Sequence, residues 1–128
     1  MDYSNLFDNT KTIAVVGLSD NKERYSYQVA EYLLNKGFKI IPVNPNIKTV
    51  FGLKSYPSLL DIKEPIDVVD IFRRSEFVAP IVDEAIKIGA KTIWMQEGVS
   101  DEVAAQAARS AGITVVMNMC MMKAHKTL

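Results

Sequence analysis

The chain has 128 residues, a length that fits one domain with a single hydrophobic core over residues 1–128. Hydrophobic residues make up 48% of it, and 15 basic side chains balance 15 acidic ones, which argues against a binding surface for nucleic acid or for an anionic membrane. The single cysteine excludes an internal disulfide and leaves no cysteine pair for structural zinc, so we expect a reducing, cytoplasmic setting.

The N-terminal stretch MDYSNLFDNTKT lacks the basic and then apolar build of a signal peptide. Nor does any apolar run approach the roughly 20 residues that span a bilayer. We therefore expect a protein that is neither exported nor bound to a membrane.

Five short runs of apolar and β-branched residues follow along the chain. Each is nearly continuous in hydrophobicity, as a strand covered on both faces requires. The runs are 12–16 (TIAVV), 39–43 (KIIPV), 67–72 (DVVDIF), 92–96 (TIWMQ) and 114–118 (TVVMN).

Helical patterns lie between these runs. The stretch 26–37 has an apolar face and ends at Gly37, a residue suited to a left-handed C-terminal cap. The patterns over 75–89 and 100–112 each begin at a serine, Ser75 and Ser100, which we expect to act as N-caps.

The second of these helices contains a proline close to its start. Pro80 is awkward in a helix that begins directly after Ser75. We therefore expect an irregular first turn before the regular helix.

The segment 44–66 interrupts the alternation with prolines, a glycine and little periodicity. Its SLLDI stretch (58–62) predicts one short helix, and GLKSY (52–56) a short extra edge strand. A long irregular excursion from the end of a central strand is often functional, and a plain surface connection is the alternative.

Alternation of strands and helices at this spacing predicts a parallel sheet with right-handed crossovers. The expected fold is α/β: an open, doubly wound, mainly parallel sheet of five or six strands, of the Rossmann-like class. In such a sheet, ligands bind beyond the carboxyl ends of the strands, near the point where strand order reverses.

The loop after the first strand offers groups suited to an anion. It contains Gly17 at a tight turn, then Ser19, Lys22, Arg24 and Ser26 before or at the helix start. Backbone donors at a helix N-terminus, hydroxyls and cations favour phosphate. A plain turn capped by serine is the alternative interpretation.

Two features argue against a nicotinamide cofactor. The later glycines of G-x-G-x-x-G are replaced by Ser19 and Lys22, and the second strand ends in Asn44-Pro45 rather than in an acid for a ribose hydroxyl. The loop is also too short for the phosphate cradle of an NTPase. The pattern therefore supports neither a dehydrogenase nor an NTPase.

Basic residues follow three of the strands: Lys22 and Arg24, then Lys48, then Arg73 and Arg74. Arg73 and Arg74 could also be a solvated approach to a helix. Taken together, these cations indicate a ligand with several phosphates.

Several blocks of the chain, in order, resemble a known family. They are AVVGLSDNKERYSYQVAEYL, IIPVNPN, FGLKSYPSL, IDVVDIFRRSE, IGAKTIWMQEGV and ARSAGITVVMN before Cys120. Over residues 8–125 the sequence is similar to small stand-alone CoA-binding proteins, which look like the CoA-binding domain of the succinyl-CoA synthetase alpha subunit. The resemblance implies binding of coenzyme A (CoA) or an acyl-CoA without ligation, since the chain shows neither the phosphohistidine segment nor the ATP domain of that enzyme.

The resemblance also implies where each part of CoA lies. The phosphates would lie against the loop after the first strand, and the nucleotide beside the exit of the second strand. The adenine would lie beside the exit of the third strand, and the pantetheine would run past the exit of the fourth strand. The residues are, in that order, Gly17, Leu18, Ser19, Arg24 and Ser26; Val43, Asn44, Pro45 and Lys48; Phe72, Arg73 and Arg74; and Gln96, Glu97 and Gly98. Lys22, in the same loop, is a further candidate for binding the ligand because of its charge.

Other polar residues carry weaker indications. Cys120 follows the fifth strand and could form a mixed disulfide with the CoA thiol, although free cysteine is usually buried and inert. His125 is expected on the surface of the tail and Trp94 in the core, and Asp67 and Asp70 are assigned no acid or base role.

Three functions remain open at this point. The leading one is non-enzymatic binding of CoA. The alternatives are a thiol redox or acyl-carrier role that uses Cys120, and a regulatory subunit that senses CoA for an acyl-CoA enzyme. A second copy of the chain is the other macromolecular partner considered, and no metal site is expected.

Overall fold

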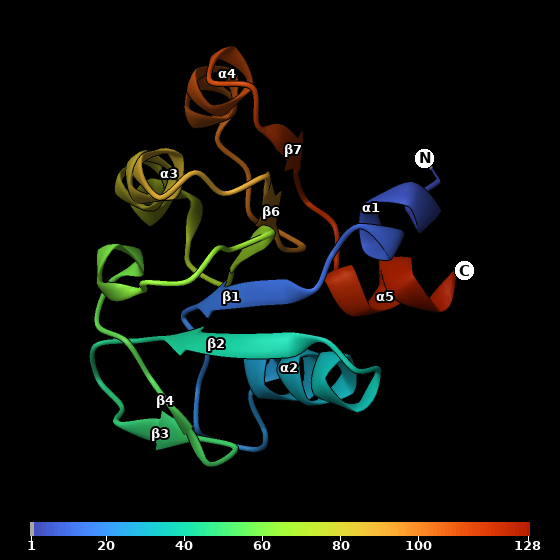
Figure 1. The fold of residues 1–128 in the computed structure, drawn as a ribbon, viewed down its shortest axis with the longest axis vertical. Coiled ribbons are helices and arrows are strands. Elements are labelled where there is room, and N and C mark those ends of the chain that lie inside the picture. Colours follow the sequence, from blue (N-terminus) through green and yellow to red (C-terminus); the bar gives the residue numbers. More distant parts are fainter. Residues whose placement is uncertain (1) are drawn as a thin grey trace.

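The structure is a computed structural model that describes residues 2–128, and its centre is one parallel sheet of five strands (Figure 1). The strand order is β2-β1-β5-β6-β7, so the order reverses between β1 and β5. This confirms the predicted doubly wound α/β fold. The strands are β1 (Thr12–Val16), β2 (Lys39–Val43), β5 (Val68–Ile71), β6 (Thr92–Met95) and β7 (Thr114–Val116).

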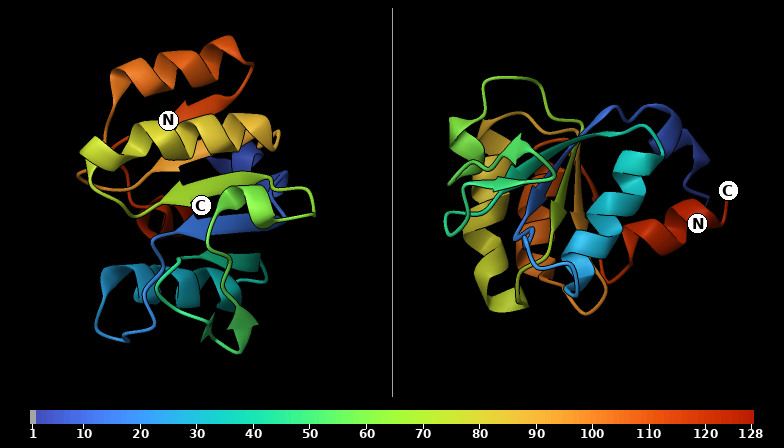
Figure 2. Two further views of the ribbon diagram at one scale, coloured as in Figure 1. Left: turned by 90° about the vertical axis from the view of Figure 1, so that its left-hand side faces the viewer. Right: turned by 90° about the horizontal axis from the view of Figure 1, so that it is seen from below.

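Helices cover both faces of the sheet (Figures 1 and 2). One face carries α2 (Tyr25–Asn35) with two terminal helices, α1 (Ser4–Asp8) and α5 (Met121–Lys126). The other carries α3 (Val78–Lys87) and α4 (Glu102–Ser110). Within residues 2–128, none of these helices has the length and apolar character needed to cross a membrane.

The sheet divides the hydrophobic core into two layers, because alternate residues of each strand face opposite sides. The layer under α2 and α5 contains Ile13, Val15 and Trp94, and the layer under α3 and α4 contains Ala14 and Ile93. All five side chains are fully buried. Burial on both faces explains why the strands are continuous hydrophobic runs.

The terminal helices were not predicted, and they pack against each other through aromatic side chains. The ring of Phe7 lies 5.0 Å from that of His125, and the Tyr32 hydroxyl lies 2.7 Å from His125 Nδ1. Indole nitrogen Nε1 of Trp94 donates a hydrogen bond to the Met119 carbonyl at 2.7 Å. His125 is thus half-buried among aromatic side chains, less exposed than the expected surface residue, whereas Trp94 is a core residue as expected.

The excursion after β2 forms a two-stranded antiparallel ribbon, β3 (Thr49–Val50) with β4 (Leu53–Lys54). The predicted extra strand thus pairs with β3 outside the main sheet, and a bridge between Tyr56 and Val43 joins its end to β2. The predicted helix is a single 3-10 turn, Leu59–Asp61, capped by the Ser58 hydroxyl.

The helix starts differ from the predicted caps. The N-cap of α4 is Asp101, whose carboxylate accepts a hydrogen bond from the Ala104 amide at 3.0 Å. Ser75 lies in a 3-10 turn, Ser75–Phe77, and its hydroxyl accepts from the Ser100 amide. This turn before α3 is the irregular start that Pro80 predicted.

Candidate functional site

Backbone and side-chain hydrogen bonds join the loops after β1, β2 and β5 at the carboxyl edge of the sheet. The Gly17 amide donates to the Val43 carbonyl at 2.9 Å, and the Phe72 amide donates to Val16 at 2.8 Å. The Asn44 side chain adds a bond to the Leu18 carbonyl at 3.0 Å. The three strand exits thus form one connected surface at the point where strand order reverses.

Gly17 makes this close approach possible. Its φ is +86°, in the left-handed region, and a Cβ at this position would lie 2.5 Å from the Phe72 carbonyl oxygen. A side chain there would therefore be strained and would push the first and third loops apart.

A polar cavity of about 420 Å³ lies over the first loop. Six of its seven lining residues belong to the predicted site, and the seventh, Tyr25, was missed although it stands between two of them. The lining residues are Gly17, Ser19, Arg24, Tyr25, Ser26, Asn44 and Phe72. The structure therefore brings together residues from three strand exits in a site open to an anion.

The two serines of the loop have distinct positions. Ser26 is buried, and its hydroxyl oxygen accepts a hydrogen bond from the Ser19 amide at 3.0 Å. The Ser19 hydroxyl accepts from the Asn21 amide at 3.0 Å. Both hydroxyls keep a hydrogen to donate, so they can shape the loop and still bind an anion. Arg24 is exposed and directly precedes α2.

Some predicted residues do not line this cavity. Lys22 is exposed in the same loop but lies outside the lining, and the side chains of Leu18 and Val43 are buried. The guanidinium of Arg73 lies 5.1 Å from the ring of Phe77. Arg74 is exposed, and its guanidinium lies 3.7 Å from the Glu76 carboxylate.

The turn after β6 borders a second cavity of about 650 Å³. Glu97 and Gly98 line it together with Tyr25, Met122 and Lys123, so Tyr25 is common to both cavities. An ion pair of 3.0 Å between Lys123 and Glu97 joins α5 to the turn.

Gln96, in contrast, is buried beside the start of α5. Its side-chain oxygen accepts a hydrogen bond from the Met121 amide at 3.0 Å. The side chain therefore positions α5, and only the neighbouring Glu97 and Gly98 reach the cavity surface.

Cys120 is buried at the start of α5, and its sulfur lies 2.7 Å from the Tyr25 hydroxyl. Burial, followed by this hydrogen bond, raises the pKa of Tyr25, so the phenol stays neutral at physiological pH. Cys120 also lines a smaller cavity beside Glu97 and Lys123.

Asp67, just before β5, and Asp70, within β5, do not meet at the site. Asp67 accepts hydrogen bonds from the amides of Lys11 and Thr12 at the opposite edge of the sheet. Burial opposes its ionisation, but these bonds and the nearby Lys91 hold the pKa of Asp67 below its ordinary value. Burial raises the pKa of Asp70, which is fully enclosed; among the described residues 2–128, neither of its carboxylate oxygens has a hydrogen-bond partner.

Metal ligands do not cluster in the described part of the chain. Over residues 2–128, no three side chains among histidine, cysteine, aspartate and glutamate are grouped as a metal site.

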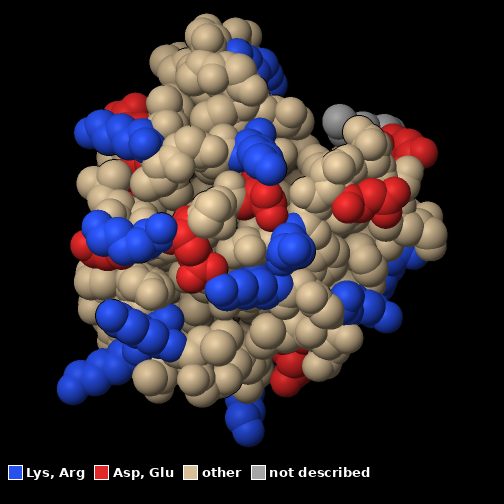
Figure 3. Space-filling view, in the orientation of Figure 1, with Lys and Arg blue, Asp and Glu red and all other residues tan. Residues whose placement is uncertain are grey.

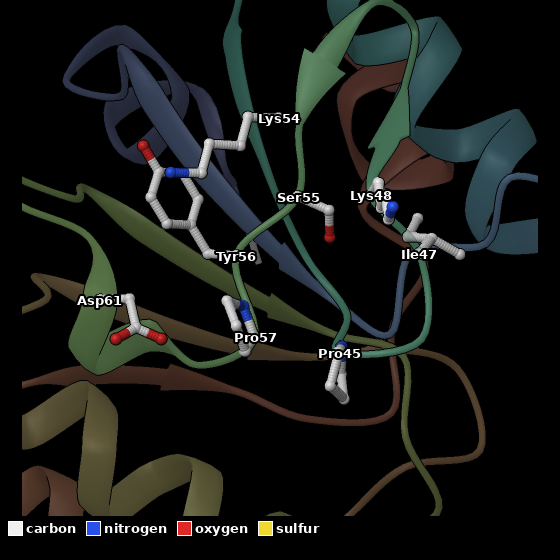
Figure 4. A pocket seen from close by; sticks show the side chains of 8 residues that line it. All are labelled: Pro45, Ile47, Lys48, Lys54, Ser55, Tyr56, Pro57 and Asp61. Atoms are coloured by element: carbon white, nitrogen blue, oxygen red, sulfur yellow. The ribbon is translucent and has the colours of Figure 1, made fainter.

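A third cavity, of about 600 Å³, lies between the exit of β2 and the β3–β4 ribbon (Figure 4). Pro45 and Lys48 were predicted here, whereas Lys54, Tyr56 and Asp61 were not. Lys54 and Tyr56 lie in the GLKSY stretch, which the sequence predicted as a strand but not as part of a site.

Known proteins with similar sequences and structures include members of a CoA-binding family. The family described as "CoA binding domain" matches residues 11–126. The uncharacterized protein YneT of Bacillus subtilis is 41% identical over 120 residues, which cover 94% of this chain and 89% of that protein. A hypothetical protein from Pyrococcus horikoshii has a solved structure with a TM-score of 0.96 and 41% identity, covering 99% of this chain and 89% of the other.

Similarity also extends to larger enzymes. An ADP-forming acetate–CoA ligase of Methanocaldococcus jannaschii is 32% identical over 81 residues, which are 63% of this chain but only 12% of the ligase. The fold, the strand-end site and the match over most of the chain agree with the family that the sequence resembled. The chain belongs to the CoA-binding domain family.

Proposed function

We propose that this chain binds coenzyme A, or an acyl-CoA, along the carboxyl edge of its sheet. The observation that carries the proposal is the first-loop cavity, where three strand exits of a CoA-binding domain bring Arg24, two serine hydroxyls and Asn44 together. Charge-assisted and neutral hydrogen bonds of this kind suit a diphosphate.

The pantetheine arm would leave the diphosphate past Phe72 and Tyr25. Tyr25 borders both the first-loop cavity and the cavity beside Glu97 and Gly98, so an extended chain can pass from one to the other. The thiol end would then lie near the Lys123–Glu97 ion pair and the start of α5.

We propose binding rather than ligation as the role of this chain. Asp67 and Asp70 both lie away from the first-loop cavity, since Asp67 forms hydrogen bonds at the opposite edge of the sheet and Asp70 is enclosed. The chain spans 12% of the acetate–CoA ligase that it resembles, and we do not extend the activity of that enzyme to it.

Isothermal titration with CoA, acetyl-CoA, NAD and ATP tests the ligand class. We expect saturable binding of CoA and acetyl-CoA, and at least tenfold weaker binding of NAD and ATP, because neither carries a pantetheine arm (about 1.4 kcal/mol per tenfold). Saturable binding of NAD with none of CoA would overturn the proposal.

A pair of variants in the first loop tests the site. Arg24→Ala should weaken CoA binding about tenfold or more, because a charge-assisted hydrogen bond contributes roughly 1.5–3 kcal/mol. Lys22→Ala removes the same charge from the same loop outside the cavity lining, so we expect a smaller loss. Unchanged affinity in Arg24→Ala would remove the loop from the binding site.

A further inference from the structure

Helix α5 forms one wall of the cavity beside the β6 exit. This cavity of about 650 Å³ is lined by five residues, two of them from the helix: Tyr25, Glu97, Gly98, Met122 and Lys123. The helix has six residues and no side-chain hydrogen bond at its N-cap, and isolated helices of that length are unstable in water. Contacts with the rest of the chain therefore decide whether this wall is in place.

Polar contacts fix the start of α5 to the turn after β6. The Gln96 side-chain oxygen accepts a hydrogen bond from the Met121 amide at 3.0 Å. The Lys123 ammonium forms an ion pair with the Glu97 carboxylate at 3.0 Å. This half of the helix therefore belongs to the cavity itself.

The other end of α5 is held by His125, which is half-buried among aromatic side chains. Its ring lies 5.0 Å from that of Phe7 in α1, 5.5 Å from Tyr32 in α2 and 5.6 Å from Phe38, which precedes β2. The Tyr32 hydroxyl lies 2.7 Å from His125 Nδ1. Figure 1 shows α1 and α5 side by side. Segments that are distant in the sequence thus meet at one imidazole.

Two ammonium groups stand close to this cluster. The Lys36 and Lys126 ammonium groups lie 5.4 and 5.3 Å from the centroid of the Tyr32 ring. Within residues 2–128, neither lysine forms an ion pair with a carboxylate. Figure 3 shows basic side chains at the right of the view, where Figure 1 places the ends of α2 and α5. A further positive charge at this place is therefore unfavourable.

The other charged groups on the packed elements do not offset these lysines. Asp8, at the end of α1, is exposed to solvent, and Lys39 of β2 is paired with Glu64. Burial, and then the charge of Lys36, lowers the pKa of His125. A proton on the imidazole therefore opposes docking of α5.

We propose that His125 is a positioning residue for CoA binding: the neutral imidazole holds α5 in place, and its protonation releases the helix and weakens binding at the cavity beside the β6 exit. This inference rests on the proposed function. If α5 is docked in only a fraction of the molecules, the apparent affinity for a ligand that needs this wall falls by that fraction. Affinity for CoA then depends on pH through a residue outside the lining of the cavity.

Calorimetric titration of wild-type protein and His125→Gln with CoA at pH 7.5 and pH 5.5 tests the linkage. Between these pH values, wild-type protein should lose at least about threefold more affinity than the variant, because glutamine can bond to Tyr32 but takes up no proton. The phosphates of CoA titrate alike in both experiments, so the comparison isolates the imidazole.

Two lysine variants refine this test. Lys36→Gln should reduce the excess loss of affinity without abolishing it, because burial is the larger cause of the lowered pKa of His125. Lys87→Gln removes the same charge from the end of α3, on the other face of the sheet, and is the matched control. It should keep the wild-type dependence on pH. An equal effect of both lysine variants would contradict a local action of Lys36.

Hydrogen exchange followed by mass spectrometry tests the release of α5 without any ligand. After correction for the intrinsic effect of pH on exchange, peptides covering 121–126 should lose protection between pH 7.5 and pH 5.5 in wild-type protein only. Peptides covering 78–87, in α3, should stay protected in wild-type protein and in His125→Gln. Equal loss of protection in both helices would mean that the whole fold opens, and would contradict the inference.

The outcomes separate this inference from the proposed function. If wild-type protein binds no CoA at pH 7.5, the proposed function fails. If it binds CoA but the affinity of His125→Gln follows the same pH profile as that of wild-type protein, the function stands and the role of His125 is wrong.

Discussion

The hydroxyl of Tyr25 lies 2.7 Å from the sulfur of Cys120 and joins the first turn of α2 to the start of α5. Tyr25 also borders the two cavities proposed for the diphosphate and for pantetheine. The one thiol of the chain is therefore buried against a residue that we propose to be part of the binding site.

We expect native Cys120 to react slowly with CoA disulfide, because only 1% of the residue is exposed. In the reaction, the Cys120 thiolate would attack one sulfur of CoA disulfide, forming a mixed disulfide and releasing CoA thiolate. Mass spectrometry should show no adduct on native protein and an adduct on protein unfolded in guanidinium. A native adduct that disappears in Cys120→Ser would instead support the redox role.

Gly17→Ala should destabilise the fold by about 2 kcal/mol or more, because it combines left-handed backbone strain with a clash against the Phe72 carbonyl. Gly37→Ala is the matched control: its φ is +95°, but nothing lies within 4 Å of the added Cβ. Urea unfolding should therefore show a smaller loss, about 1 kcal/mol, for Gly37→Ala. Equal losses would mean that backbone strain alone matters.

Asp70→Asn should change how stability depends on pH. Burial raises the pKa of Asp70 in the folded state, so above about pH 4 the folded protein holds a proton that the unfolded chain releases. Wild-type stability should therefore fall as pH rises towards the folded-state pKa, by up to about 1.4 kcal/mol per pH unit from this group. The variant should lack this contribution. Urea unfolding of both proteins at pH 5 and pH 8 measures the difference, and parallel pH profiles would contradict it.

His125→Gln should also change how stability depends on pH, but in the opposite direction to Asp70→Asn. Burial, and then the charge of Lys36, lowers the pKa of His125. Below about pH 6.5 the unfolded chain therefore binds more protons than the folded one, and stability falls as pH falls. Between pH 7.5 and pH 5.5, wild-type protein should therefore lose more stability than the variant. Thermal unfolding at the two pH values measures this difference, and an equal loss in both proteins would contradict a lowered pKa of His125.

Much of the fold could be predicted from local pattern. The bounds of β1 and β2 were predicted without error, because strands buried on both faces are hydrophobic along their whole length. The irregular turn before α3 followed from Pro80. The caps were harder: Asp101, not Ser100, caps α4, because either side chain can reach a free amide and only the local backbone geometry selects one.

Elements stabilised by distant contacts could not be predicted. Helices α1 and α5 have five and six residues and no side-chain caps, and aromatic packing between Phe7, Tyr32 and His125 holds them in place. Isolated helices of this length are unstable in water. Local periodicity therefore carries little signal for them.

The sequence by itself determined the doubly wound sheet and the residues of the first loop, because both depend on neighbours along the chain. Only the tertiary structure decided that Tyr25 covers Cys120 and that Lys54 and Tyr56 form a cavity beside Pro45. These groups come from separate segments, and hydrogen bonds and packing across strand exits bring them together. Contacts of that kind leave no periodic pattern in a single sequence.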